Sequence, residues 1–180
     1  TIRRRCGSLC DVCRVPRAIF VGHSMGGYDM MLFQLKYPSY VAGWVLYATG
    51  PGFSKEKPWV KWNAGALQMA DKYKKKGLEA LVGSDKHMGH RTALGLEYGL
   101  RGIYQQRKED PLFVEFPEGP FVAAKRIGSC TVPTAIIVGE RDRAFGRACE
   151  MMHAKIKGST YAKIPNAGHM AARSEEHTSE

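Results

Sequence analysis

The chain has 180 residues, 44% of them apolar, and a formal net charge of +10 at pH 7. This content of apolar residues is enough for a substantial core and agrees with a single globular domain. The longest apolar run, residues 41–48, is strand-sized and far below the ~20 residues of a membrane span, so we expect no membrane association. The basic residues form no recognised nucleic-acid module, so we expect solvated helix faces instead, with attraction of an anionic substrate as the alternative.

The first expected element is a helix that precedes a strand over residues 18–21. Its cysteines, Cys6, Cys10 and Cys13, have the spacing of a radical-SAM iron–sulfur site. The alternative is that Leu9, Cys10 and Cys13 line one apolar helix face. We favour the packing interpretation, because the barrel that would surround a cluster is absent, and expect no cofactor. The odd number of five cysteines indicates free thiols and favours a cytoplasmic location.

The segment Gly22-His23-Ser24-Met25-Gly26-Gly27 follows the first strand and opens a helix predicted over residues 25–37. It has the Gly-x-Ser-x-Gly pattern and the strand-to-helix context of a nucleophile elbow. We expect a Cβ at Gly22 or Gly26 to strike the neighbouring strand or helix. The backbone N–H of Met25 would be an oxyanion donor, and His23 is expected to be structural, with its side chain directed away from the serine.

A second strand is expected over residues 41–48, followed by a long excursion over residues 51–129. Its amphipathic spacing, with a helix that begins near Lys57, predicts a helical cap. Candidate substrate-lining residues are the large apolar side chains of this cap, although packing within the cap is the alternative for each: Trp59, Trp62, Met69, Met88 and Tyr98. His87 and His90, three residues apart, could in principle bind a metal ion, but we expect no metal site.

Two further strands are expected over residues 134–138 and 161–164, with a helix over residues 144–157 between them. The first strand runs into Gly139-Glu140-Arg141-Asp142 and the second into Gly168-His169. Alternation of strands and helices predicts an α/β fold with a parallel sheet covered by helices. Ser24, Asp142 and His169 therefore each follow the carboxyl end of a predicted strand.

Serine, aspartate and histidine in this order resemble the catalytic triad of the α/β-hydrolase family, and the resemblance extends over residues 15–170. It implies that Ser24 is the nucleophile, His169 the base and Asp142 the orienting acid. Glu140 is the rival acid, but Asp142 matches the family position. The other position at which the family places its acid carries Thr49 and Gly50.

The segment 48–53 and the small cap resemble those of bacterial enol-lactone and carboxylic-ester hydrolases. The resemblance implies hydrolysis of a small-molecule ester, lactone or related acyl bond through an acyl-serine intermediate, without a cofactor. The alternatives are a C–C bond hydrolase, a haloperoxidase-like enzyme, or a non-catalytic scaffold of the same fold. The sequence makes no prediction of oligomeric state.

Both ends of the chain differ from the family pattern. Few residues precede Ser24, so we expect a fragment that lacks N-terminal strands and the loop of the second oxyanion donor. We also expect the closing C-terminal helix to be missing, because residues 173–180 resemble a translated sequencing adapter and are expected to be a non-native tail. The predicted organisation is hydrolase core over residues 1–50 and 130–172, with the cap over residues 51–129.

Overall fold

The computed structural model describes residues 2–76, 113 and 115–170 of the chain, with side chains from residue 7 onward. It divides into two compact units. The first, here called the core unit, comprises residues 1–52 and 122–180, and the second, the inserted unit, comprises residues 53–121. The candidate site described below lies entirely within the core unit.

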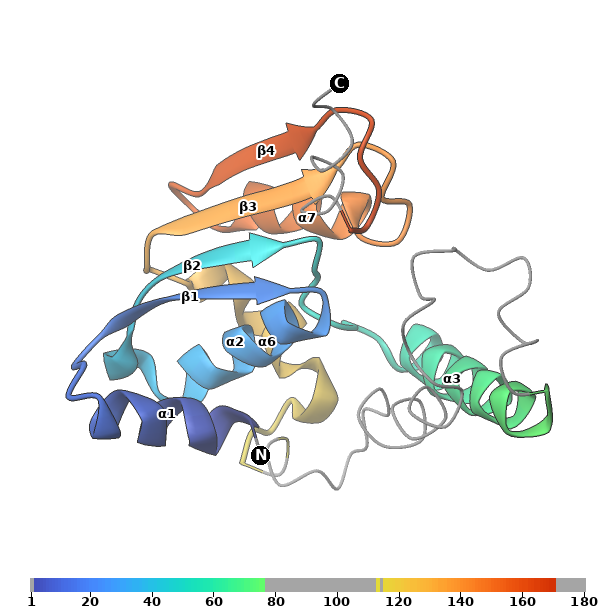
Figure 1. Cartoon of the computed structure of the whole chain (residues 1–180), viewed down its shortest axis with the longest axis horizontal. Coiled ribbons are helices and arrows are strands. Elements are labelled where there is room, and N and C mark those ends of the chain that lie inside the picture. The colour runs from blue at the N-terminus through green and yellow to red at the C-terminus, as the bar shows by residue number, and fades with distance from the viewer. Residues whose placement is uncertain (1, 77–112, 114, 171–180) are drawn as a thin grey trace. The chain divides into compact units, whose positions relative to one another are not determined.

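The core unit contains a four-stranded parallel sheet with helices packed against it (Figure 1). Its strands are β1 (Ala18–His23), β2 (Val41–Tyr47), β3 (Thr134–Gly139) and β4 (Thr160–Ile164), in the spatial order β1-β2-β3-β4. Each pair of neighbouring strands is parallel, with Phe20 opposite Trp44 and Leu46 opposite Ile136. The α/β class and the parallel sheet predicted from the sequence are confirmed.

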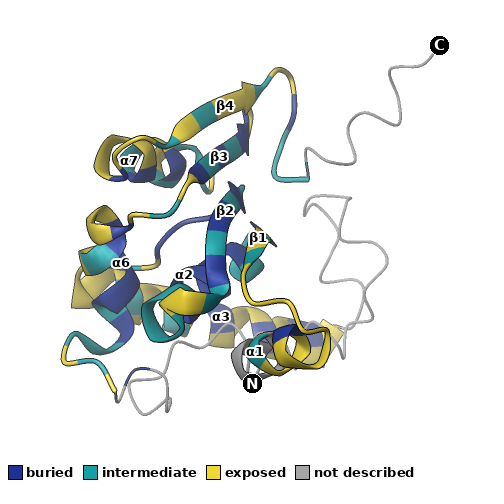
Figure 2. Cartoon of the chain, turned by 90° about the vertical axis from the view of Figure 1, so that its left-hand side faces the viewer, coloured by how far each residue is buried: buried dark blue, intermediate teal, exposed yellow. Residues whose placement is uncertain are grey.

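The helices of the core unit are α1 (Ile2–Val12), α2 (Met25–Lys36), α6 (Val122–Arg126) and α7 (Gly146–Lys155), with short 3-10 turns at Pro38–Tyr40 and Ile127–Ser129. Figure 2 shows α2, α6 and α7 on the same side of the sheet. Helix α2 ends before Pro38, as expected, because proline disfavours the α conformation in the residue that precedes it.

The main core lies between this side of the sheet and the helices. Trp44, Leu46, Ile136 and Val138 point to it and are buried, and Phe33 of α2 is fully buried there. Side chains alternate along a strand, so Ile19 and Val21 of β1 point to the opposite face, where they are 68% and 71% exposed. The helix-covered face therefore carries the packing that holds the site in place.

The apolar face predicted for the N-terminal helix is wrong in two of its three residues. Cys10 is buried, but Leu9 is 62% exposed and Cys13 is also exposed. The helix ends at Val12 and Arg14 has a positive φ of 55°, so Cys13 lies in the turn that follows and no longer has helical spacing. Among the residues that the structure describes, no three His, Cys, Asp or Glu side chains are grouped as a metal ion would require.

The inserted unit contains α3 (Glu56–Lys76) and a 3-10 turn at Gly119–Phe121. Its buried helix positions, Ala66, Ala70 and Tyr73, are spaced by four and three residues and form one face. Trp59 contacts the ring of Phe121, with centroids 6.0 Å apart. No helix in the described parts of the chain combines the length and the apolar character that crossing a membrane requires.

Candidate active site

Three side chains from three separate loops meet at the carboxyl ends of the strands. Ser24 directly follows β1, Asp142 lies in the turn after β3, and His169 lies in the turn after β4. Nε2 of His169 is 3.0 Å from Oγ of Ser24, and Nδ1 of His169 is 2.9 Å from Oδ2 of Asp142. The structure thus brings together the three residues that the sequence predicted as nucleophile, base and acid, in an unbroken hydrogen-bonded line.

Ser24 occupies a strained backbone conformation at the start of α2. Its φ is 54° and its ψ is −120°, a combination rarely adopted by residues with a side chain. Its N–H donates to the carbonyl of Tyr47 over 3.0 Å, and its own carbonyl accepts from Gly27 N and from the hydroxyl of buried Thr49. These backbone contacts hold the serine in the sharp turn that presents its hydroxyl to His169.

The turn depends on Gly22 and Gly27, whereas the sequence predicted Gly22 and Gly26. A Cβ at Gly22 would lie 2.5 Å from Cα of Gly27, and a Cβ at Gly27 would lie 2.5 Å from the Thr49 side chain. At Gly26 a Cβ would have no atom within 4 Å. The expected steric role of Gly26 is therefore wrong, because the close approach to helix α2 is made one residue later.

We predict that Gly22→Ala and Gly27→Ala each lower the free energy of unfolding by about 1–3 kcal/mol, because the backbone of the turn or Thr49 must move. Gly26→Ala should be neutral or raise stability by up to about 1 kcal/mol, since alanine is favoured over glycine in a helix. Guanidinium unfolding of the three variants measures the difference. Equal losses in all three would contradict the assignment.

Asp142 is nearly completely buried and has partners for both carboxylate oxygens. Oδ1 accepts hydrogen bonds from the backbone N–H groups of Ala144 and Phe145, each 3.0 Å long, and Oδ2 faces His169. These bonds turn the chain before α7, which begins at Gly146 and not at the predicted residue 144. The carboxylate is thereby fixed against the imidazole.

Glu140, the rival acid, has a different role in the structure. It is exposed, and its Oε2 accepts a hydrogen bond from the backbone N–H of Asn166 over 2.9 Å. Arg141 donates to the Asn166 side chain from the same turn. The geometry therefore favours Asp142 as the partner of the histidine.

Two rings pack against the imidazole of His169. The ring of Phe145 is stacked on it, with centroids 5.1 Å and planes 22° apart, and the ring of His23 is 4.8 Å away. His23 also donates from Nε2 to the backbone carbonyl of His169 over 3.0 Å. The sequence predicted a structural role for His23 but missed this contact, because nothing in the local pattern pairs it with a residue so distant along the chain.

Met25 is the first residue of α2, so its N–H has no carbonyl four residues earlier within the helix. The positive end of the helix dipole lies at this point. The role of the Met25 N–H as an oxyanion donor remains a prediction.

The predicted lining residues lie partly within the described residues. Trp62 and Met69 are 43% and 41% exposed on α3, and Trp59 is half-buried. Met88 and Tyr98, like His87 and His90, lie outside the described residues.

Cys149 of α7 supports the loop that precedes the inserted unit. Its thiol is buried and donates to the carbonyl of Thr49 over 3.2 Å, and burial raises the pKa of Cys149 to about 11.

We predict that iodoacetamide at pH 8 modifies exposed Cys13 in the folded chain but leaves Cys149 unmodified until denaturant is added, because thiolate is the reactive form. Peptide mapping by mass spectrometry checks this, and rapid labelling of Cys149 in the folded chain would contradict it.

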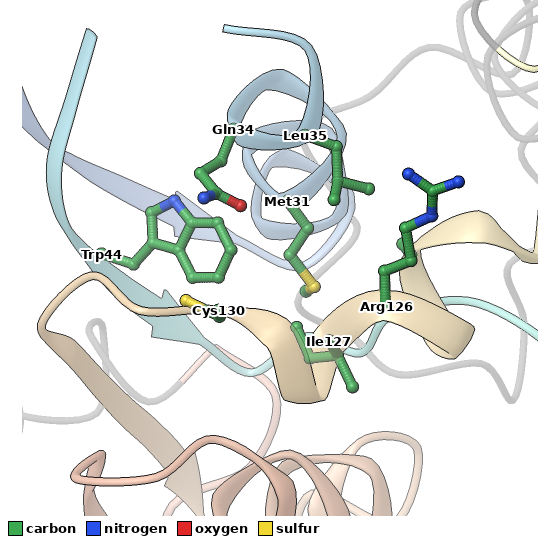
Figure 3. Close-up of a pocket in the computed structure, with 8 residues that line it drawn as sticks. Met31, Gln34, Leu35, Trp44, Arg126, Ile127 and Cys130 are labelled. Carbon is green, nitrogen blue, oxygen red and sulfur yellow. The ribbon is translucent and has the colours of Figure 1, made fainter. Parts of the chain in front are cut away.

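A separate small pocket lies on the helix-covered side of the sheet, between α2, β2 and α6. Figure 3 shows Met31 and Gln34 beside Trp44 and Cys130 in this pocket. Nε1 of Trp44 is buried there and has no hydrogen-bond partner among the described residues. None of the three predicted catalytic residues lines the pocket, so it is not the candidate active site.

Comparison with known proteins assigns the chain to one family. Residues 4–178 match the family described as "Alpha/beta hydrolase family". The chain belongs to the alpha/beta hydrolase family. The sequence-based resemblance is thereby confirmed, and the order of Ser24, Asp142 and His169 is the one this family uses.

Two curated relatives are each 25% identical to this chain. They are a proline iminopeptidase of Saccharolobus solfataricus, matched over 86% of this chain and 57% of its own length, and a putative 2-succinyl-6-hydroxy-2,4-cyclohexadiene-1-carboxylate synthase of Bacillus subtilis, matched over 89% and 62%. The chain thus spans about three fifths of the length of these relatives.

Among solved structures, the chain is similar to an esterase from Exiguobacterium antarcticum, with a TM-score of 0.69 and 16% identity over 97% of this chain and 68% of that one. It is also similar to a carboxylesterase structure from Nitrososphaera gargenis, with a TM-score of 0.69 and 13% identity over 97% and 65%. At these identities the likeness shows the fold alone.

Proposed function

We propose that the chain carries the catalytic residues of a serine hydrolase that cleaves an ester, lactone or related acyl bond of a small molecule. The observation that carries this proposal is the hydrogen-bonded line Ser24–His169–Asp142, with distances of 3.0 and 2.9 Å. A serine hydroxyl is a weak nucleophile until a base takes its proton, and this arrangement supplies that base.

In the proposed reaction, Oγ of Ser24 attacks the substrate carbonyl while Nε2 of His169 takes the hydroxyl proton. The Asp142 carboxylate accepts a hydrogen bond from Nδ1–H, which keeps Nε2 free of a proton and stabilises the imidazolium that forms. The imidazolium then gives its proton to the leaving oxygen, which leaves an acyl-serine. A water molecule deprotonated by His169 hydrolyses the acyl-serine and restores the site.

The N–H of Met25 is the proposed donor to the oxyanion that forms during attack. It opens α2 directly after the nucleophile, where the unpaired N–H groups and the helix dipole favour negative charge. A preorganised donor of this kind is worth about 10² to 10³ in rate. Trp59, Trp62 and Met69 of α3 are proposed to contribute to the apolar surface that selects the acyl substrate.

An acyl substrate is favoured because several structural neighbours are described as acting on such bonds. They include the esterase of Exiguobacterium antarcticum and an N-acyl homoserine lactone degrading enzyme. A second candidate is C–C bond or haloperoxidase-like chemistry, since a meta-cleavage product hydrolase and a putative non-heme bromoperoxidase have the same fold. A scaffold without activity is the third.

Covalent labelling with a fluorophosphonate tests the proposal, because it requires an activated serine and no knowledge of the substrate. We expect a single adduct on Ser24 of the folded chain, located by peptide mass spectrometry. A chain that is heat-denatured before the reagent is added should gain no adduct. A panel of acyl esters and lactones then assigns the substrate class. A folded chain in which Ser24 gains no adduct would favour the scaffold.

A further inference from the structure

His23, which precedes the nucleophile, touches the predicted base in two independent ways. Its Nε2 donates to the backbone carbonyl of His169 over 3.0 Å, and the two imidazole rings are 4.8 Å apart with an interplanar angle of 37°. The other ring contact of His23 is with Tyr47, the last residue of β2, at 4.7 Å. The side chain therefore spans the space between the sheet and the loop that carries the base.

His169 lies in the loop after β4, so its hydrogen bond to Ser24 depends on how firmly this loop is held against the sheet. The start of the loop is attached through the N–H of Arg141, which donates to Ala167 over 2.8 Å. The next two residues are Gly168, whose carbonyl lies so close to Gly139 that a Cβ at Gly139 would strike it, and His169 itself. The bond from His23 holds the carbonyl of His169 directly, beyond this point of the loop.

The attachment runs to the part of the molecule that also positions the nucleophile. His23 is the last residue of β1, and Ser24 is fixed by its N–H bond to Tyr47. The ring of His23 thus holds the loop of the base, and the backbone of the adjacent Ser24 is held by Tyr47 of the neighbouring strand. A displacement of the His169 loop would lengthen the Nε2–Oγ distance, and misplacement by about 1 Å can cost about 10²-fold in rate.

Histidine suits this position because its ring nitrogen reaches the carbonyl while the ring body packs against Tyr47. The bond requires a proton on Nε2, which fixes the tautomer of the neutral ring. Burial lowers the pKa of His23 below its usual value, although the hydrogen bond to the His169 carbonyl acts in the opposite direction. A neutral ring is the appropriate neighbour for a base that becomes positively charged during the reaction.

We propose that His23 is a positioning residue, which holds His169 within reach of Ser24 through the hydrogen bond to the His169 carbonyl and through ring contact. This role rests on the proposed function of the site. It differs from a general packing role because it depends on one donated N–H. Two variants separate the donor from the ring.

His23→Gln retains an N–H donor of similar reach, and His23→Phe retains a ring against Tyr47 but has no donor. We expect fluorophosphonate to label Ser24 of the His23→Phe variant about 10- to 100-fold more slowly than in the unsubstituted chain. His23→Gln should restore most of that loss, within about 3-fold, because a misplacement smaller than 1 Å costs correspondingly less. His153→Phe, at an exposed histidine of α7 that is stacked on Tyr161, is the matched control and should label at the unsubstituted rate.

Two outcomes of the labelling would overturn the proposal. One is an unchanged rate in a folded His23→Phe variant, as judged by its thermal melt. The other is an equal loss in His23→Gln and His23→Phe, which would show that the donated N–H is not the cause.

A long-range ¹H–¹⁵N spectrum of the histidine rings needs neither activity nor substitution. The proposal requires His23 to be the Nε2–H tautomer, with a ring proton protected from exchange with solvent. An Nδ1–H tautomer or a rapidly exchanging proton would overturn the proposal even if the folded chain were unreactive. A chain with the expected tautomer but no labelling at Ser24 would instead contradict the proposed function alone.

Discussion

Replacing Ser24 with alanine is expected to abolish hydrolysis of an activated ester, with a loss of up to about 10⁶-fold in kcat. The substitution removes only the hydroxyl that faces Nε2 of His169. The contacts that hold the turn are made by the Ser24 backbone, with Tyr47, Gly27 and Thr49, so the fold should be retained. Release of p-nitrophenol and a thermal melt measure the two effects.

His169→Ala should be comparably severe, since nucleophile and base act as one unit and their losses do not add. The double variant is therefore expected to be no slower than either single variant. Substantial activity in the Ser24→Ala variant would assign the reaction to another group. A loss of activity accompanied by unfolding would have no bearing on the catalytic role, so the melt is the necessary control.

Asp142→Asn is expected to lower kcat by about 10³ to 10⁴ while leaving the site's geometry intact. The asparagine carbonyl can still accept from the N–H groups of Ala144 and Phe145, as Oδ1 of the aspartate does. Its amide group would then face Nδ1 of His169 as a donor, which favours the wrong tautomer of the imidazole and places a proton on the nitrogen that must accept one.

Glu140→Gln is the matched control for this substitution. Glutamine keeps an oxygen that can accept from the N–H of Asn166, which is the contact Glu140 makes. We expect its rate to lie within a few-fold of the unsubstituted chain when both variants are assayed on the same ester. A near-normal rate for Asp142→Asn together with a large loss for Glu140→Gln would reverse the choice of acid.

The sequence alone was sufficient for the framework of the core unit and for the order of its site. Continuous apolar runs between turn-forming residues predicted the strands now seen at Val41–Tyr47 and Thr134–Gly139. Strands of a parallel sheet are typically covered on both faces, so their sequences are apolar at nearly every position. Ser24, Asp142 and His169 could be placed together because the carboxyl ends of parallel strands lie at one edge of a sheet. The strand predictions use local pattern alone, whereas the choice of these three residues also rests on the resemblance of their order to the alpha/beta-hydrolase triad.

What the sequence could not supply are contacts between residues that are far apart along the chain. Glycine is needed at position 27 because the Thr49 side chain lies close to it. His23 forms its hydrogen bond with His169, which is 146 residues away in the sequence. Likewise, Cys13 loses its helical spacing because α1 ends at Val12, and Leu9 is 62% exposed although it lies within α1. Local periodicity determines which face of an element is apolar, but only the folded chain decides which atoms approach that face and how closely.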